Sequence, residues 1–396
     1  EAYYEDMDML NILRADEYPR CTEYVGEMIS IIESLIDKGH AYVAKDGVYF
    51  SIASAPEKYG MLTGQNIDAV LGGAGGRVSE SGKRDHKDFA LWKSAKPDEP
   101  TWPSPWGDGR PGWHIECTAM SMDHLGEQFD IHGGGQDLLF PHHEAEIFQG
   151  ECHTGCNPVV SHWLHNGFVN MDGEKMSKSL GNFWTIREIC EKIDPLVLRF
   201  ALLNAHYRSP IDMNEQLLHD AGRNHSRILT VYKQALENQC QTPLPLPKGD
   251  VTSGVPLIKS LGLIEKQAEA LAKAMDDDFN SREAVAKVLG GVREIGKSLD
   301  SDLEAKDKSS FANFAVEWME EYAGLVLGIL PSREEIMIQK VDPKREEIRL
   351  EVEDLLKRRT DARANKDWPA ADAIRDKLVA LGVTVVDTAD GPEWEL

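Results

Sequence analysis

The sequence predicts an open α/β domain, followed by an all-α helical bundle and a small C-terminal domain. The α/β prediction rests on the apolar residues Phe129–Ile131, which indicate a short buried strand that runs into the glycine loop Gly133–Gly135. Pro141 then opens a helix, at a position where its missing N–H costs nothing. From Asp194 onward apolar residues recur at helical spacing, as in a bundle, until Pro331 interrupts the pattern.

The composition is that of a folded protein with several domains. The 396 residues are 41% hydrophobic and 28% charged, which excludes general disorder, and no apolar run is long enough to cross a bilayer. Lys and Arg number 43 and Asp and Glu 67, so the net charge is −24 and disfavours indiscriminate binding to DNA or anionic lipid. A local basic patch remains compatible with a nucleic-acid partner. The six cysteines are irregularly spaced, which indicates a reducing compartment, and we expect a cytoplasmic protein.

The elements before the α/β stretch follow from periodicity and turn residues. Apolar residues at helical spacing predict a helix over Cys21–Lys38 that ends at Gly39. Alternation over Ala41–Ile52 around the turn Asp46–Gly47 predicts a hairpin. The glycine-rich and charge-rich stretch Ile67–Lys87 predicts a loop.

The elements after the α/β stretch are mostly helices. Four apolar stripes predict the bundle helices Leu217–Gln239, Val255–Met275, Ser281–Leu299 and Phe311–Leu330. Beyond the break, the pattern predicts helices over Arg345–Asn365 and Pro369–Leu381 and a short strand over Val383–Val386.

One group of residues has the side chains of a metal site. His142 and Glu146 are four residues apart, so both project from one face of the helix that follows Pro141, near His143 and Glu144. Together with Cys117 they offer a thiolate, an imidazole and a carboxylate, which are ligands of Zn²⁺. The alternative is that Cys117 is a core thiol and that the histidines line a polar surface.

A second group has the composition of a phosphate clamp. Lys175 and Lys178 stand three residues apart among small hydroxyl side chains, in a stretch that ends at Gly181. Two such lysines can hold phosphate oxygens and stabilise charge at a reacting phosphorus. By composition alone, a solvated basic turn is the simpler interpretation.

The full strings of residues carry a resemblance. Lys175–Ser179 reads KMSKS, the signature of class I aminoacyl-tRNA synthetases, without alteration. Further stretches over nearly the whole chain resemble cysteinyl-tRNA synthetases; they are Pro111–Cys117, Phe129–Gly135, Phe140–Glu144, Asn166–Phe168, Asp194–Pro210, Met275–Asn280 and Lys357–Asp387.

The resemblance implies a Rossmann-type class I catalytic domain that lacks its first part. The segment with the HIGH motif and a fourth, cysteine zinc ligand would lie before Glu1, so we expect the chain as given to be incomplete for activity. The expected catalytic part consists of 1–38, the remnant of the first half of the catalytic fold, 39–108, an inserted connective region, and 109–170, the second half with the zinc site. The KMSKS loop and stem-contact region follows over 171–215. The remaining expected domains are 216–332, the helical bundle that binds the anticodon stem, and 333–396, the C-terminal tRNA-binding domain.

The same resemblance implies an activity and its residues. The activity is ATP-dependent conversion of L-cysteine to cysteinyl-adenylate and its transfer to the 3′ end of tRNA(Cys), with Mg²⁺ accompanying ATP and zinc binding the substrate thiolate. The implied residues are Lys175 and Lys178 for catalysis and ATP binding, Gly134 and Asp137 for ATP binding, Trp113 and His132 for cysteine binding, and Cys117, His142 and Glu146 for zinc.

The C-terminal region is the expected tRNA contact. Leu355–Lys377 holds seven Lys or Arg residues against four Asp, with Trp368 available for stacking on a base. The basic residues are Lys357, Arg358, Arg359, Arg363, Lys366, Arg375 and Lys377. We expect a monomer with no membrane partner. Two alternatives are a ligase that joins adenylated cysteine to a small amine and a non-catalytic tRNA- or zinc-binding protein.

Overall fold

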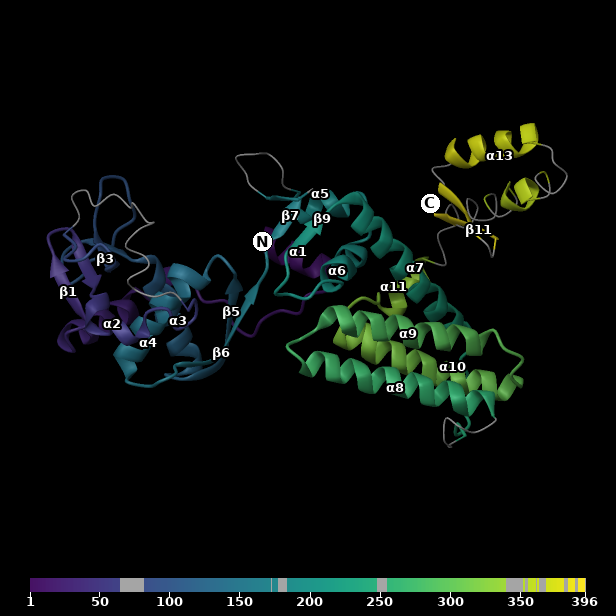
Figure 1. The fold of residues 1–396 in the computed structure, drawn as a ribbon, viewed down its shortest axis with the longest axis horizontal. Helices are drawn as coiled ribbons and strands as arrows, with labels where there is room; N and C mark the ends of the chain where they lie inside the picture. The colour runs from purple at the N-terminus through teal and green to yellow at the C-terminus, as the bar shows by residue number, and fades with distance from the viewer. Residues whose placement is uncertain are drawn as a thin grey trace. The chain divides into compact units, whose positions relative to one another are not determined.

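The computed structural model divides into two compact units, Glu1–Ile329 and Leu330–Leu396 (Figure 1). The described residues are 1–64, 82–171, 173–176, 184–247, 255–339, 352, 355–360, 362, 368–380, 384–388 and 391–395. No helix among these residues is long and apolar enough to span a lipid bilayer.

The N-terminal part of the first unit is a helix packed on an antiparallel sheet. After the short helix α1 (Ala2–Met9) and a 3₁₀ turn, the predicted helix runs as α2 (Val25–Asp37). The predicted hairpin is confirmed as β1 (Ala41–Ala44) and β2 (Gly47–Phe50), which β3 (Phe89–Ser94) and β4 (Gly109–Pro111) extend in the order β1-β2-β3-β4. Most of the predicted loop Ile67–Lys87 lies outside the described residues.

One apolar core holds this sheet to the helices that carry the candidate site. Met28 of α2, Phe50 of β2, Ile115 of α3 (Trp113–Leu125) and Phe148 of α4 (Glu144–Thr154) are all buried in one cluster. The ring centroids of Phe50 and Phe148 lie 5.4 Å apart. This packing fixes α3 and α4 against one another from the side of the sheet.

The α/β stretch contains a two-stranded parallel sheet, β5 (Phe129–Gly135) beside β6 (Val160–Asn166). Two details of the prediction are wrong. The glycines 133–135 form part of β5 and pair with β6, so they are not a loop. Ile131 is 52% exposed, because the described residues leave this face of the small sheet uncovered.

The glycines of β5 serve close packing. A Cβ on Gly134 would lie 2.7 Å from Cε1 of His143, so only glycine lets the strand approach that ring. Phe140 has extended backbone angles, Pro141 follows it in a turn over Leu139–His143, and α4 continues from there.

A second small sheet follows, with the order β8-β7-β9. Its strands are β7 (Val169–Met171), β8 (Glu174–Lys175) and β9 (Ile211–Met213). Helices α5 (Ile186–Cys190) and α6 (Pro195–Leu203) lie between β8 and β9 in the chain. The carboxylate of Asp194 accepts a hydrogen bond from the backbone N–H of Leu196 at 2.8 Å, which caps α6.

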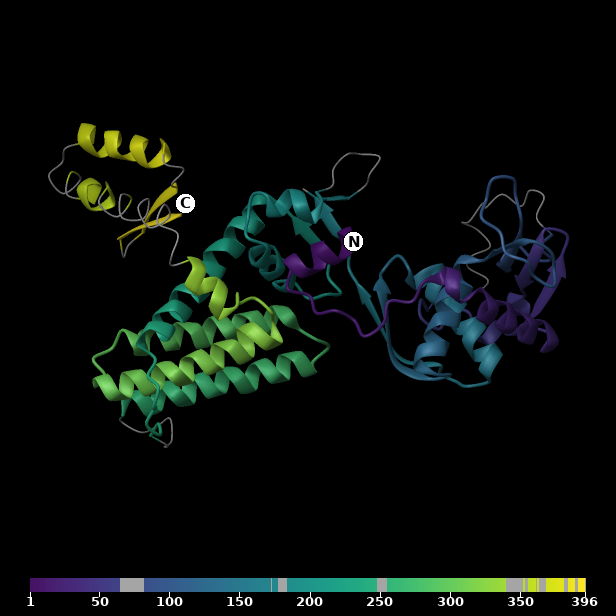
Figure 2. The same ribbon diagram turned by 180° about the vertical axis from the view of Figure 1, so that it is seen from behind.

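The predicted helical bundle is confirmed. Its helices are α7 (Glu215–Asn238), α8 (Pro256–Asp276), α9 (Ser281–Leu299) and α10 (Ala305–Met319), and a wider helical turn over Glu320–Val326 continues α10. Helices α8, α9 and α10 run side by side in both views (Figures 1 and 2).

The second unit is small and has its own apolar core. It holds α11 (Arg333–Gln339), helical residues 355–360, α13 (Trp368–Ala380) and an antiparallel pair, β10 (Thr384–Thr388) and β11 (Gly391–Glu395). Val352, Leu355, Leu356, Ile374 and Leu378 pack together. Helix α13 and strand β10 agree with the prediction, whereas β11 was not predicted. Much of the predicted helix Arg345–Asn365 lies outside the described residues.

Candidate metal centre and active site

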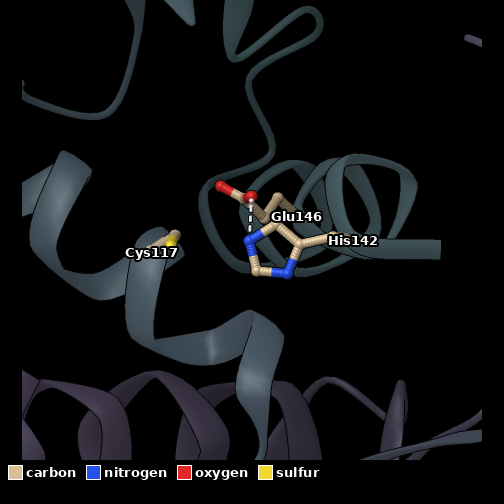
Figure 3. Close-up of side chains that lie close together, drawn as sticks. All are labelled: Cys117, His142 and Glu146. Atoms are coloured by element: carbon tan, nitrogen blue, oxygen red, sulfur yellow. Dashed lines mark ion pairs between the residues drawn. The ribbon is translucent and has the colours of Figure 1, made fainter. Parts of the chain in front are cut away.

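Helices α3 and α4 bring a thiol, an imidazole and a carboxylate together. Ligand atoms of Cys117, His142 and Glu146 all lie within 4.8 Å of one another. Figure 3 shows the sulfur of Cys117 on one helix facing His142 and Glu146 on the next. Cys117 is half-buried, and the other two residues are buried. The spacing predicted from the sequence therefore corresponds to a compact set of three donors.

The pair of His142 and Glu146 contains one buried carboxylate oxygen that accepts no hydrogen bond from the described residues. Nε2 of His142 lies 3.1 Å from Oε1 of Glu146, as expected for neighbours on one helix face. Oε1 nevertheless accepts no hydrogen bond from the described residues. A buried carboxylate oxygen without a donor is costly, and a cation beside it would remove that cost. The donor set and this oxygen together fit Zn²⁺.

Burial keeps the thiol and two imidazoles of the site uncharged at neutral pH. Burial and the nearby carboxylate of Glu146 raise the pKa of the Cys117 thiol to about 12. Burial and the neighbouring histidines lower the pKa of His143 to about 3, and burial with His142 and Lys93 lowers that of His114 to about 4. These two imidazoles are therefore neutral at neutral pH.

A second group of donors shares Glu146. Ligand atoms of His132, His143 and Glu146 also lie within 4.8 Å of one another. Nε2 of His132 is 3.5 Å from Oε2 of Glu146, and Nδ1 of His143 is 2.7 Å from Nε2 of His165. The carboxylate thus faces His142 with one oxygen and His132 with the other.

Trp113 lies at the rim of the site. Its ring centroid is 4.5 Å from that of His142, and 55% of its surface is exposed. As the first residue of α3, Trp113 projects beyond the core. An exposed indole beside the donor set is placed to contact a small ligand bound there.

The residues expected to bind ATP lie on two separate elements. Gly134 is in β5 against His143, and the exposed Asp137 lies over Gly135, where a Cβ would be 2.5 Å from its Oδ1. Lys175 lies on the edge strand β8, paired through its backbone with Asn170, and its side chain is not described. Lys178 lies outside the described residues.

Sequence reasoning placed one residue wrongly and missed two others. Glu144 belongs to another network, in which its carboxylate accepts hydrogen bonds from the backbone of Gly60, Leu62 and Thr63. It points there because its position on α4 is two residues from Glu146, on a different helix face. The missed residues are His114 and His165, whose contacts with the site join different elements.

Comparison with known protein families defines the class first. The family described as tRNA synthetases class I (C) catalytic domain matches residues 1–223, the DALR domain matches residues 270–331 and the cysteinyl-tRNA ligase anticodon binding domain matches residues 345–394. A solved structure assigned as an arginyl-tRNA synthetase from Campylobacter jejuni has a TM-score of 0.52 at 14% identity, covering 83% of this chain and 66% of its own. The fold is thus that of a class I aminoacyl-tRNA synthetase.

Full-length relatives give the particular family. A cysteine–tRNA ligase from Pelobacter propionicus is 42% identical over 100% of this chain and 81% of its own length. Another from Trichlorobacter lovleyi is 45% identical over 99% of this chain and 80% of its own length. The chain belongs to the cysteine–tRNA ligase family, so the resemblance stated from the sequence is confirmed, and with it an ATP-using ligase that acts on tRNA.

Proposed function

We propose that the chain forms cysteinyl-adenylate from L-cysteine and ATP and passes the cysteinyl group to the 3′ end of tRNA(Cys), with zinc held by Cys117, His142 and Glu146. The observation that carries the zinc site is the convergence of three donor atoms within 4.8 Å beside a buried carboxylate oxygen that accepts no hydrogen bond from the described residues. We further propose that it acts as a cytoplasmic monomer, within the domain boundaries expected from the sequence.

The chemistry at this site is selection of a thiol. Zinc bound there would take up the thiolate of cysteine far more readily than the hydroxyl of serine, which a pocket of fixed shape separates poorly. Trp113 at the rim and His132 beside Glu146 would contact the bound amino acid. The half-exposed indole then covers the ligand and excludes water from it.

Adenylate formation needs positioned charge. The carboxylate of cysteine attacks the α-phosphorus of ATP, the bond to the bridging oxygen breaks, and pyrophosphate leaves. Lys175 and Lys178 stabilise the negative charge that spreads over the phosphate oxygens, and Mg²⁺ accompanies the nucleotide. Gly134 and Asp137 bind the adenosine side. In this scheme the lysines act as cations and not as bases.

The substitution Cys117→Ala tests the zinc site directly. We expect the full chain to bind one equivalent of zinc, measured by atomic emission, and the variant to lose it because two ligands cannot hold the ion alone. In protein that also carries the segment expected before Glu1, cysteine-dependent exchange of ATP with pyrophosphate should be lost in parallel. Cys240→Ala is the matched control, since Cys240 lies outside the donor set. A full equivalent of zinc in Cys117→Ala would overturn the ligand assignment.

A further inference from the structure

His114 lies directly behind the proposed zinc ligand His142. It is the second residue of α3, only 9% of its surface is exposed, and its Nδ1 is 2.9 Å from Nδ1 of His142. His142 is 3% exposed. The contact therefore joins the helix of Cys117 to the turn that precedes α4, in a place that water does not reach.

Two imidazole nitrogens at this distance share one proton. Two N–H groups would repel each other, and two lone pairs would leave both buried acceptors unpaired. One of the two Nδ1 atoms therefore carries the hydrogen and the other accepts it. The accepting ring is neutral, with its proton on Nε2.

The far side of His142 indicates which nitrogen donates. Its Nε2 lies 3.1 Å from Oε1 of Glu146, but Oε1 accepts no hydrogen bond from any residue that the structure describes. A proton on Nε2 would thus be held in the plane of the ring without pointing at that oxygen. Only the tautomer with the proton on Nδ1 leaves the Nε2 lone pair directed into the donor set.

We propose that His114 is a positioning residue, whose Nδ1 accepts the Nδ1 proton of His142 and thereby keeps Nε2 of His142 unprotonated and oriented for zinc. The inference rests on the proposed zinc site. Ligating histidines commonly donate their second N–H to a carboxylate or carbonyl, and here the acceptor is a neutral histidine. Loss of such a partner typically costs about 10–100-fold in metal affinity.

Two substitutions at this position separate the hydrogen bond from packing. His114→Phe keeps a ring and removes the acceptor, and we expect the affinity of the full chain for Zn²⁺, measured by competition with a chelator, to fall about 10–100-fold. His114→Asn keeps an acceptor where Nδ1 stood, so its affinity should stay within about threefold of wild type. Equal affinities of wild type and His114→Phe would overturn the proposal.

A matched control excludes a general effect of losing a buried histidine. His225 is 2% exposed and its Nε2 lies 2.8 Å from the carbonyl oxygen of Ile329, far from the donor set in sequence. His225→Phe should lower stability and leave the zinc affinity unchanged. A loss of zinc affinity in His225→Phe equal to that in His114→Phe would overturn the proposal.

The tautomer of His142 can be measured in the wild-type protein without any substitution. Nitrogen NMR of histidine-labelled, metal-free wild type should show His142 with its proton on Nδ1. A proton on Nε2 would overturn the proposal even where His114→Phe fails to fold. Absence of zinc binding in wild type would overturn the proposed metal site and this inference together, whereas unchanged affinity in His114→Phe overturns the inference alone.

Discussion

The two carboxylates at the start of α4 differ in their partners and should differ in their effects. Glu146 faces His142 and His132, whereas Glu144 accepts hydrogen bonds from the backbone of Gly60, Leu62 and Thr63. Glu146→Gln removes a charged donor from the metal site, so we expect at least about a tenfold loss of zinc affinity by chelator competition. Glu144→Gln should keep that affinity. Its cost should be in stability, about 1–3 kcal/mol in urea unfolding. The reverse pattern would contradict the assignment of both residues.

The buried histidines make the stability of the metal-free protein depend on pH. Burial and neighbouring charged groups lower the pKa of His114 to about 4 and that of His143 to about 3, from an ordinary value of 6.5. Between those values and about 6.5 the unfolded chain binds more protons than the folded chain, so the free energy of unfolding falls as the pH falls. The Tm measured in a chelator should therefore decrease from about pH 7 to about pH 5.

One substitution measures how much His143 contributes to that decrease in Tm. In His143→Gln the titrating ring is absent, so the Tm should decrease less over the same pH range. The exposed His162 provides the control, and His162→Gln should follow wild type. A decrease in His143→Gln as large as that of wild type would show that other groups cause it.

At the scale of elements, the helices were predictable because their signals are local. The apolar stripe and the caps Asn214 and Asn280 lie within the segments that they define, and α7 and α9 begin immediately after these caps. The exposure of Ile131 was not predictable, because burial of a short strand depends on what covers it. The contacts of His114 and His165 likewise join elements that are distant in the chain.

The packing of α9 against α10 depends on one glycine. A Cβ on Gly291 would lie 2.2 Å from Cη2 of the buried Trp318, so Gly291→Ala must displace the helix or the indole. Overpacking costs about 1–3 kcal/mol, and the gain in helix propensity returns less than about 1 kcal/mol, so urea unfolding should show a net loss of stability.

The adjacent glycine is the control for that substitution. A Cβ on Gly290 would meet only the side-chain end of Gln267, with Oε1 at 2.9 Å, and this flexible side chain can move away. Gly290→Ala should therefore be neutral or stabilise by up to about 1 kcal/mol. Equal destabilisation by both substitutions would mean that the two helices do not pack as described.

At the scale of the whole molecule, the negative net charge opposes binding of a negatively charged partner. A chain of net charge −24 repels a polyanion at long range, yet it belongs to a family that acts on tRNA. Binding is still possible where local basic surfaces of the protein contact the tRNA. In the second unit, the exposed Lys357, Arg358 and Lys377 lie on two helical segments that share the core of Leu355, Leu356 and Leu378. This small unit thus has exposed cations that the net charge of the whole chain does not reveal.

The dependence of tRNA binding on salt tests this local contact. Each phosphate contact releases counterions, so loss of one should make the slope of log K against log salt shallower by about 1 and weaken binding at low salt. We expect this from Lys357→Ala when binding of tRNA(Cys) is titrated over a range of salt concentrations. Lys45→Ala removes another exposed lysine, from the turn between β1 and β2, and should leave the slope unchanged. The same change of slope in both variants would assign the effect to net charge and not to a phosphate contact of Lys357.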